Sequence, residues 1–327
     1  MPRSLTQTLI ASLLFLLGTL GLEQTARAQV LTEVSAAQPA ISHKFQKVGE
    51  LEIFYREAGP RDAPVVLLLH GYPSSSHMFR DLMWRLAENY RVIAPDLPGF
   101  GATTAPPREE YEYSFENLTN AIEGFTEALE LDRYALYVFD YGAPTGFRLA
   151  ARHPERVSAI VSQNGNAYRE GLRTAWGPVQ EYWANPTQEN RDALRVLQQP
   201  QTTTWQYYEG VPEELRHLIG PDGIAHDQAI LDRPDGAEKQ LDLQYDYRTN
   251  VAAYADWQAY FRAYRPPFLA VWGRNDPFFG PAGAEAFKRD LPDAEIHFVD
   301  SGHFALETHA PQIAALMLDF FNRHIGD

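Results

Sequence analysis

Three polar residues with catalytic potential follow segments that resemble β-strands. Asp140 ends the stretch "YALYVFD", Asp276 ends "PPFLAVWGRND", and His303 ends "AEIHFVDSGH". In a catalytic triad an acid orients a histidine, and the histidine then acts as a base for the nucleophile or for water. The order nucleophile, acid, histidine along the chain is one that such triads use. The sequence therefore predicts nucleophilic catalysis by Asp140, with Asp276 as the acid and His303 as the base.

Each of these residues also has a structural interpretation. An aspartate between a strand and a helix often caps the helix, which would account for Asp140 alone. Asp276 could instead initiate a turn before Pro277, and Asp293 and Asp300 are alternative acids near the histidine. The triad is favoured because all three candidates close a predicted strand in the order that the chemistry requires.

The loop around Asp140 suits the presentation of a nucleophile. Gly142 permits a sharp turn from strand to helix, and the helix that follows would direct its positive end toward the carboxylate. Val138 stands where the motif G-x-S-x-G has its first glycine, and that motif occurs nowhere in the chain. A carboxylate that attacks a saturated carbon forms an alkyl ester, which activated water can then cleave. The loop therefore predicts displacement at saturated carbon followed by hydrolysis.

The elements that must position these residues follow a βα rhythm. Strand-like and helical stretches alternate over residues 43–167 and return over 266–327, and the run "PVVLLLHG" is apolar throughout, as in a strand buried on both faces of a parallel sheet. Residues 168–265 show helical stretches and many aromatic residues but no convincing buried strand. We expect an α/β protein with a doubly wound, mostly parallel sheet and an inserted helical lid.

Over nearly its whole length after the N-terminal segment, the chain resembles the α/β-hydrolase family. It is similar in particular to the branch with an aspartate nucleophile, namely the epoxide hydrolases and the haloalkane dehalogenases. The resemblance rests on the motif "HGYP" at 70–73 and on the three triad residues. It implies an α/β-hydrolase fold and an oxyanion hole formed by the backbone N–H groups of Tyr72 and Tyr141. No metal or organic cofactor is expected.

The leaving group distinguishes the two kinds of enzyme. An epoxide oxygen needs a proton donor, which a tyrosine with a pKa of about 10 can be, whereas a halide needs only weak N–H donors. The segments around Tyr182 and Tyr247 resemble those from which epoxide hydrolases place two lid tyrosines over the nucleophile. We therefore expect hydrolysis of an epoxide to a vicinal diol, with Tyr182 and Tyr247 as the donors. Ordinary aromatic packing is the alternative for both.

Two other functions remain open. The serine-rich continuation of "HGYP" resembles the haloalkane dehalogenases, although Tyr141 and Tyr72 stand where many of them have Trp and Asn to hold halide. A haloalkane or haloacid dehalogenase with the same triad is the first alternative, and a non-catalytic ligand-binding protein on the same fold is the second. The expected partner is a small apolar substrate in a pocket lined by His70, Phe139, Trp176 and Trp183.

The N-terminal segment predicts export. A basic residue at position 3, an apolar run over 9–22 and the tripeptide "ARA" at 26–28 have the layout of a cleaved signal peptide, and the run is short for a membrane span. We expect a signal peptide over 1–28, a tether over 29–42 and a periplasmic or secreted mature protein, with an uncleaved anchor as the alternative. A formal charge of −15 disfavours nucleic acid and anionic membranes as partners, and the chain has no cysteine for a disulfide.

Overall fold

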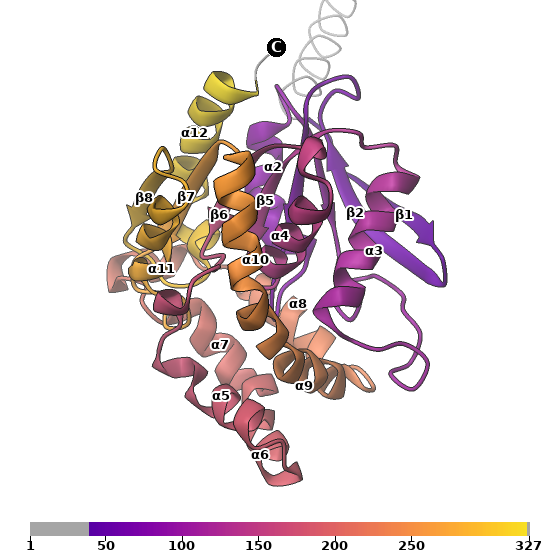
Figure 1. The fold of residues 1–327 in the computed structure, drawn as a ribbon. Helices are drawn as coiled ribbons and strands as arrows, with labels where there is room; N and C mark the ends of the chain where they lie inside the picture. Colours follow the sequence, from indigo (N-terminus) through magenta and orange to yellow (C-terminus); the bar gives the residue numbers. More distant parts are fainter. Residues whose placement is uncertain (1–38, 326–327) are drawn as a thin grey trace, which may run out of the picture. The chain divides into compact units, whose positions relative to one another are not determined.

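The computed structural model describes residues 39–325, and the folded body of the protein begins at Ile41 (Figure 1). The predicted signal peptide and most of the predicted tether lie outside the described residues. Within residues 39–325 there is no helix with the length and apolar character needed to cross a membrane.

An eight-stranded sheet forms the centre of this body, in the order β1-β2-β4-β3-β5-β6-β7-β8. Strand β2 pairs antiparallel with β1 and with β4, and the pairings from β4 through to β8 are parallel. This confirms the predicted mostly parallel, doubly wound sheet. The strands are β1 (Ser42–Val48), β2 (Leu51–Ala58), β3 (Val65–Leu69), β4 (Arg91–Pro95), β5 (Tyr134–Phe139), β6 (Val157–Gln163), β7 (Phe268–Gly273) and β8 (Glu295–Val299).

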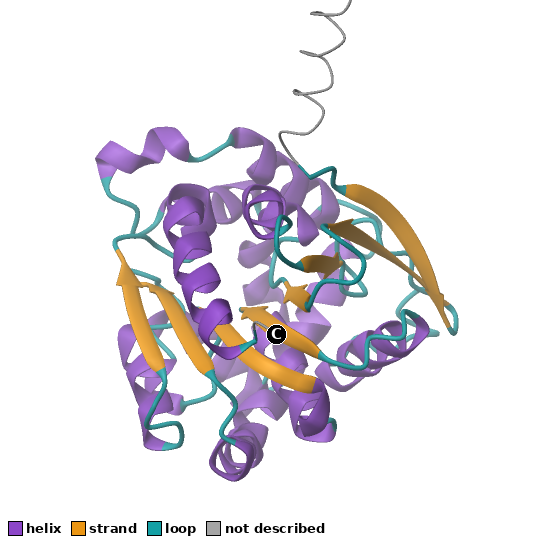
Figure 2. Cartoon of the chain, turned by 90° about the horizontal axis from the view of Figure 1, so that it is seen from above, coloured by secondary structure: helices purple, strands orange, loops and turns teal. Residues whose placement is uncertain are grey.

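Helices lie on both faces of the sheet (Figure 2). In the central strand β3, Val66 and Leu68 pack into one hydrophobic cluster and Leu67 and Leu69 into another, as expected of a strand whose side chains alternate between two buried faces. The helices of the core are α2 (Arg80–Leu86), α3 (Phe115–Ala128), α4 (Gly142–Arg152), α11 (Pro281–Ala286) and α12 (Ala305–His324). Helix α2 packs with α12, and α3 packs with α4.

The chain between β6 and β7 forms the predicted helical insertion. Figure 1 shows α5 to α9 gathered beyond one end of the sheet. The last helix, α10, instead packs against α4, where the Trp257 and Phe147 rings lie 5.6 Å apart, so it covers the sheet as a crossover helix. We use the word lid for α5 to α9. The six helices are α5 (Gly177–Ala184), α6 (Gln188–Ala193), α7 (Pro200–Tyr208), α8 (Pro221–Leu231), α9 (Gly236–Asp246) and α10 (Arg248–Tyr264).

The C-terminal helix differs from its expected extent. The amphipathic pattern predicts a helix from Ala310 onward, but α12 begins at Ala305, two residues after His303, and is interrupted at His309. Pro311 explains the interruption because proline lacks an N–H donor and its ring clashes with the preceding turn. A short helical turn therefore links the predicted base to the amphipathic helix.

Candidate active site

Asp140 occupies a tight turn between β5 and α4. Its φ of 47° lies in the left-handed region, which few residues other than glycine adopt and which is often retained at functional sites. A Cβ atom on Gly142 would lie 2.1 Å from the carbonyl oxygen of Leu69, and one on Gly71 would lie 2.3 Å from the Cβ of Asp140. The turn thus depends on glycine at both positions. Helix α4 has no side-chain cap, so the capping interpretation of Asp140 is wrong.

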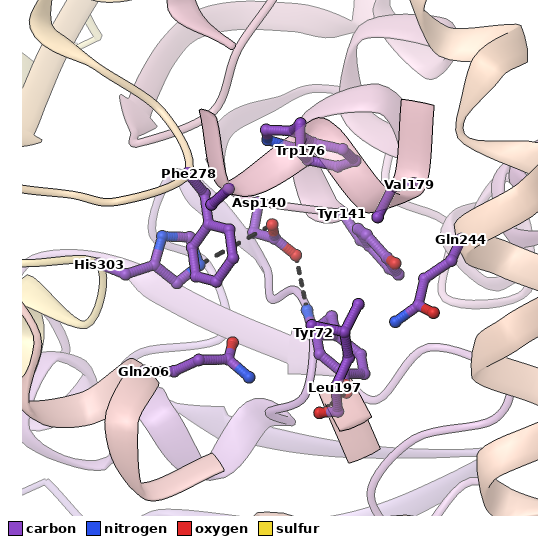
Figure 3. Close-up of a pocket in the computed structure, with 11 residues that line it drawn as sticks. Tyr72, Asp140, Tyr141, Trp176, Val179, Leu197, Gln206, Gln244, Phe278 and His303 are labelled. Carbon is purple, nitrogen blue, oxygen red and sulfur yellow. Dashed lines mark hydrogen bonds and ion pairs between the residues drawn. The ribbon is translucent and has the colours of Figure 1, made fainter. Parts of the chain in front are cut away.

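Two backbone N–H groups stabilise the ionised Asp140 carboxylate. That of Tyr72 donates to Oδ1 at 2.7 Å (Figure 3), and that of Tyr141 also lowers the pKa of the carboxyl. These are the two groups expected to form an oxyanion hole. Burial raises the pKa of Asp140 from 3.8 to about 6, against the opposing effects of His303 and of the two N–H groups. The carboxylate is therefore ionised, but poorly solvated, at neutral pH.

His303 links the two aspartates. Its Nδ1 lies 2.8 Å from Oδ2 of Asp276, and its Nε2 lies 3.8 Å from Oδ2 of Asp140. Burial alone would lower the pKa of His303, but the neighbouring charges of Asp276 and Asp140 raise it above its usual value. The structure brings the three predicted triad residues together, and Asp276 rather than Asp293 or Asp300 contacts the ring. A separation of 3.8 Å is too long for a direct hydrogen bond and suits a bridging water.

Asn164 is a functional residue that the sequence prediction missed. It follows β6, and its Nδ2 donates to Oδ2 of Asp276 at 2.7 Å while its Oδ1 accepts from the N–H of Gly273 at 2.8 Å. The N–H of Phe278 donates to the other oxygen of Asp276 at 2.7 Å. The available signal was an asparagine before a glycine at the carboxyl end of a parallel strand, where ligand-binding residues gather. Asn164 and Phe278 together fix the orientation of the acid.

A pocket opens between this group and the lid, and its empty space, including the part that is open to solvent, is about 460 Å³. Its wall is more apolar than polar. No group of three or more potential metal ligands occurs in the region 39–325. Figure 3 shows Trp176 and Val179 on one side of Asp140 and Gln206 on another. The lining residues are Tyr72, Asp140, Tyr141, Ala175, Trp176, Val179, Leu197, Gln206, Gln244, Phe278 and His303.

The structure does not bring the two predicted lid tyrosines together over Asp140. The Tyr182 ring packs on Tyr245 at 4.8 Å, and its hydroxyl accepts from Arg191 at 3.5 Å, so Tyr182 faces away from the pocket. Tyr247 is fully buried one layer behind the lining. Tyr182 was expected to point into the pocket, but its place on α5 directs it elsewhere. The side chains of a helix point in different directions around its axis, and likeness between two sequences does not show which side of the helix faces the pocket.

Tyr247 nevertheless lies next to the site. Its ring centroid is 4.4 Å from that of Trp176 and 5.9 Å from that of Tyr141. Among the described residues, neither the Tyr247 hydroxyl nor Nε1 of Trp176 has a hydrogen-bond partner, although both atoms are buried. An unpaired buried donor costs about 1–3 kcal/mol, so such groups call for a functional explanation.

Three of the four predicted pocket residues lie outside the pocket lining. Nε2 of His70 accepts from the N–H of Leu97 at 2.9 Å, so His70 stabilises the loop after β4. The Phe139 ring packs behind His303 at 4.6 Å. The Trp183 ring stacks on Tyr247, so it too is a packing residue. Only Trp176 was placed correctly.

The fold is that of a hydrolase, and the site combines a candidate nucleophile at a strand-to-helix turn with a histidine and an aspartate that contacts it. Residues 64–310 match the family described as the alpha/beta hydrolase fold, and the chain belongs to that family. The chain is 41% identical to an uncharacterized hydrolase of Saccharomyces cerevisiae, over 85% of this chain and 96% of the yeast protein. It is 39% identical to a haloalkane dehalogenase of Psychrobacter cryohalolentis, over 84% of this chain and 88% of that enzyme.

Solved structures agree on the fold. Haloalkane dehalogenase DbeA from Bradyrhizobium elkani has a TM-score of 0.69 at 22% identity, covering 87% of this chain and 100% of that one. A laboratory-evolved variant of potato epoxide hydrolase has a TM-score of 0.70 at 20% identity, and the match covers 87% of this chain and 100% of that one. Relatives and structural neighbours thus include both classes of enzyme that the resemblance named.

Proposed function

We propose that this protein hydrolyses epoxides to vicinal diols through an ester on Asp140. The observation that supports an epoxide is the phenol of Tyr141, which follows the nucleophile directly and lines the pocket. Burial, together with the charge of Asp140, raises the pKa of Tyr141 well above its ordinary value, so this phenol stays protonated at neutral pH. Tyr72 is the other phenol in the lining, but its hydroxyl already donates to the carbonyl of Leu197 at 2.7 Å.

In the first step, Oδ2 of Asp140 attacks an epoxide carbon. The carbon–oxygen bond of the ring breaks, and the oxygen accepts the proton of the Tyr141 hydroxyl as it becomes an alcohol. Oδ1 keeps its hydrogen bond to the N–H of Tyr72 and becomes the carbonyl oxygen of the new ester. The product of this step is a hydroxyalkyl ester of Asp140.

In the second step, His303 takes a proton from water and the resulting hydroxide attacks the ester carbon. Negative charge then develops on Oδ1, which the N–H group of Tyr72 already contacts and which the N–H group of Tyr141 is expected to stabilise as well. Collapse of this intermediate returns the carboxylate and releases the diol, whose second hydroxyl keeps the remaining proton of the attacking water. The proton held by His303 then returns to the Tyr141 phenolate, which restores the enzyme. Formation of the ester also removes the negative charge of Asp140, which had helped to raise the pKa of His303. The pKa of His303 is therefore lower in the ester than in the free enzyme, so the imidazole is neutral and can accept a proton from water in the second step.

A haloalkane dehalogenase is the second candidate, and Trp176 is the residue that favours it. Nε1 of Trp176 is a buried donor without a partner in the described chain, and an N–H group can stabilise a halide without transferring a proton. Several relatives at 30% identity or above are named haloalkane dehalogenases, which is consistent with halide as the leaving group. The same Asp140 ester and the same hydrolytic step would follow.

Two substrate classes and two variants separate the candidates. We expect diol from small terminal epoxides and little halide from bromoalkanes. Tyr141→Phe should reduce epoxide opening by about 10²-fold or more, the usual range for loss of a general acid, and should affect bromide release far less. If halide is the true leaving group, Trp176→Phe should instead reduce bromide release more than it reduces epoxide opening. Bromide release without diol formation would establish the second candidate.

Heavy-oxygen water tests the covalent route independently of the leaving group. A single turnover with excess enzyme should yield unlabelled product, while repeated turnovers should label the side chain of Asp140. Tyr182→Phe is a suitable control variant because it removes a hydroxyl from the lid without altering the pocket lining. Label that enters the product in the first turnover would exclude the ester.

A further inference from the structure

We infer that Gln206 binds a neutral polar group of the substrate, so that the substrate carries a hydroxyl, ether, carbonyl or amide at some distance from the reacting carbon. This inference rests on the proposed function, because it concerns the same pocket. Gln206 lies on α7 with its side chain in the pocket lining (Figure 3). It is one of two amides in a wall that is otherwise mostly apolar.

The two amides differ in whether they already have a partner. The amide of Gln244 bonds to that of Gln198, with Nε2 of Gln198 and Oε1 of Gln244 3.3 Å apart, and the reversed orientation of Gln198 gives an equivalent bond of 3.0 Å. Gln206 is only 1% exposed, and no described residue forms a hydrogen bond with its side chain. A buried amide is stabilised by a partner, so the free amide of Gln206 is the one available to a substrate.

Helix α7 holds Gln206 in place. Thr203, one turn earlier, donates to Oε1 of Gln228 at 2.7 Å. Tyr207, the next residue, stacks on Phe304 with ring centroids 4.1 Å apart, and its hydroxyl donates to Asp227 at 2.6 Å. Because contacts on both sides fix the helix, the amide is presented from a rigid element rather than from a loop. Such fixed groups select substrates by geometry.

The charges around the pocket indicate that the bound group is neutral. The lining contains the carboxylate of Asp140 and the ring of His303, but no lysine or arginine. A carboxylate or phosphate on the substrate would meet the charge of Asp140 in a poorly solvated space and would have no cation from the lining to pair with. Gln206 can donate and accept, which matches a hydroxyl, an ether, a carbonyl or an amide. A haloacid therefore fits this pocket less well than a neutral epoxide.

The test compares a terminal epoxide that has a hydrocarbon tail with the same epoxide carrying a hydroxyl at the end of the tail. The parent enzyme should show a higher kcat/KM for the hydroxylated epoxide. In Gln206→Met, which keeps the length of the side chain but removes the amide, the ratio of the two kcat/KM values should fall about tenfold, equivalent to about 1.4 kcal/mol. Gln201→Leu, an exposed change on the same helix, should leave the ratio unchanged.

The outcomes separate this inference from the proposed function. An unchanged ratio in Gln206→Met and in a second variant, Gln206→Leu, would overturn the inference while leaving epoxide hydrolysis intact. If neither epoxide reacts, the proposed function fails, and the same comparison is made with a bromoalkane and the matching bromoalkanol. If those are inert too, binding of a diol and of the matching triol is measured by tryptophan fluorescence. A preference for the triol that Gln206→Met abolishes supports the role of Gln206, and a preference that persists overturns it.

Discussion

The two sides of the pocket differ in how completely their polar groups are paired. On the sheet side, Asp140, His303 and Asp276 form a connected set of hydrogen bonds and ion pairs that Asn164 extends. On the lid side, Nε1 of Trp176 and the hydroxyl of Tyr247 are buried without a partner among the described residues. The amide of Gln206 lines the pocket and forms no hydrogen bond with a described residue. The sheet side is thus complete before a substrate arrives, whereas the lid side has hydrogen-bonding capacity left for the substrate.

This difference indicates that the sheet side of the pocket serves catalysis and the lid side serves substrate recognition. Catalytic groups need fixed mutual geometry, and a packed parallel sheet provides it because the carboxyl ends of neighbouring strands meet at one edge. Recognition groups need to vary with the substrate, and helices outside the sheet can change without altering the triad. If this division holds, changes on the sheet side should affect the chemistry, and changes on the lid side should affect the choice of substrate.

The largest expected effect is that of Asp140→Asn. Loss of the nucleophile should reduce activity by about 10⁴-fold or more. The variant should also be more stable than the parent at pH 8, by roughly 3 kcal/mol, because the fold raises the pKa of Asp140 from 3.8 to about 6 and each unit is equivalent to about 1.4 kcal/mol. Asparagine tolerates the left-handed backbone of this turn.

The sign of this stability difference can be checked against pH. An ionised carboxylate destabilises the fold when its folded pKa is raised, so the gain in Asp140→Asn should be largest above pH 6 and should disappear as the pH falls toward 4. Denaturant unfolding of both proteins at several pH values measures it. A variant that is less stable than the parent at pH 8 would contradict the burial argument.

The next effect is the pH dependence of ester formation. The attacking carboxylate must be ionised, so kcat/KM should fall about tenfold per pH unit below a midpoint near pH 6, about two units above an ordinary aspartate. Initial rates with a terminal epoxide between pH 4.5 and 8 measure this limb. A midpoint near pH 4 would indicate that Asp140 is solvated in the working enzyme.

A smaller effect is expected for Asn164→Ala. This change removes one of the hydrogen bonds that orient Asp276, so His303 should be less well positioned and activity should fall by about 10-fold to 100-fold. Because His303 acts in the second step, mass spectrometry should show the Asp140 ester accumulating during turnover. An equal slowing of both steps, without accumulation, would indicate a general loss of structure.

The smallest effect is expected for Tyr182→Phe. Since its hydroxyl faces Arg191 and lies outside the pocket lining, activity on epoxides should stay within about twofold of the parent value, because no group that contacts the substrate is lost. The comparison with Tyr141→Phe is informative, because both variants lose one phenol hydroxyl. A large loss in Tyr182→Phe would mean that the lid closes differently over a bound substrate.

The sequence predicted the sheet side of the site better than the lid side. Asp140, Asp276 and His303 were identified because a buried parallel strand is visible as an apolar run and its end locates the site. The lid offers no such marker, since its aromatic residues occur throughout and tertiary packing determines which of them faces inward. Trp176 and Trp183 were both chosen for their residue type, and only the first lines the pocket, while Tyr182 was assigned by likeness alone. Gln206 was missed because nothing local distinguishes it from an exposed glutamine.

The hydrogen bond between Asn164 and Asp276 has a consequence for the attachment of the helical insertion. The two residues are 112 positions apart, and the whole helical insertion is enclosed between them. The bond joins the segment that follows β6 to the segment that follows β7, so it links the chain on both sides of the insertion. It also orients Asp276. An inserted segment that is anchored in this way can be lengthened, shortened or exchanged for another without moving the triad. In this chain, a change in the lid would therefore alter the wall of the pocket while Asp140, Asp276 and His303 keep their positions.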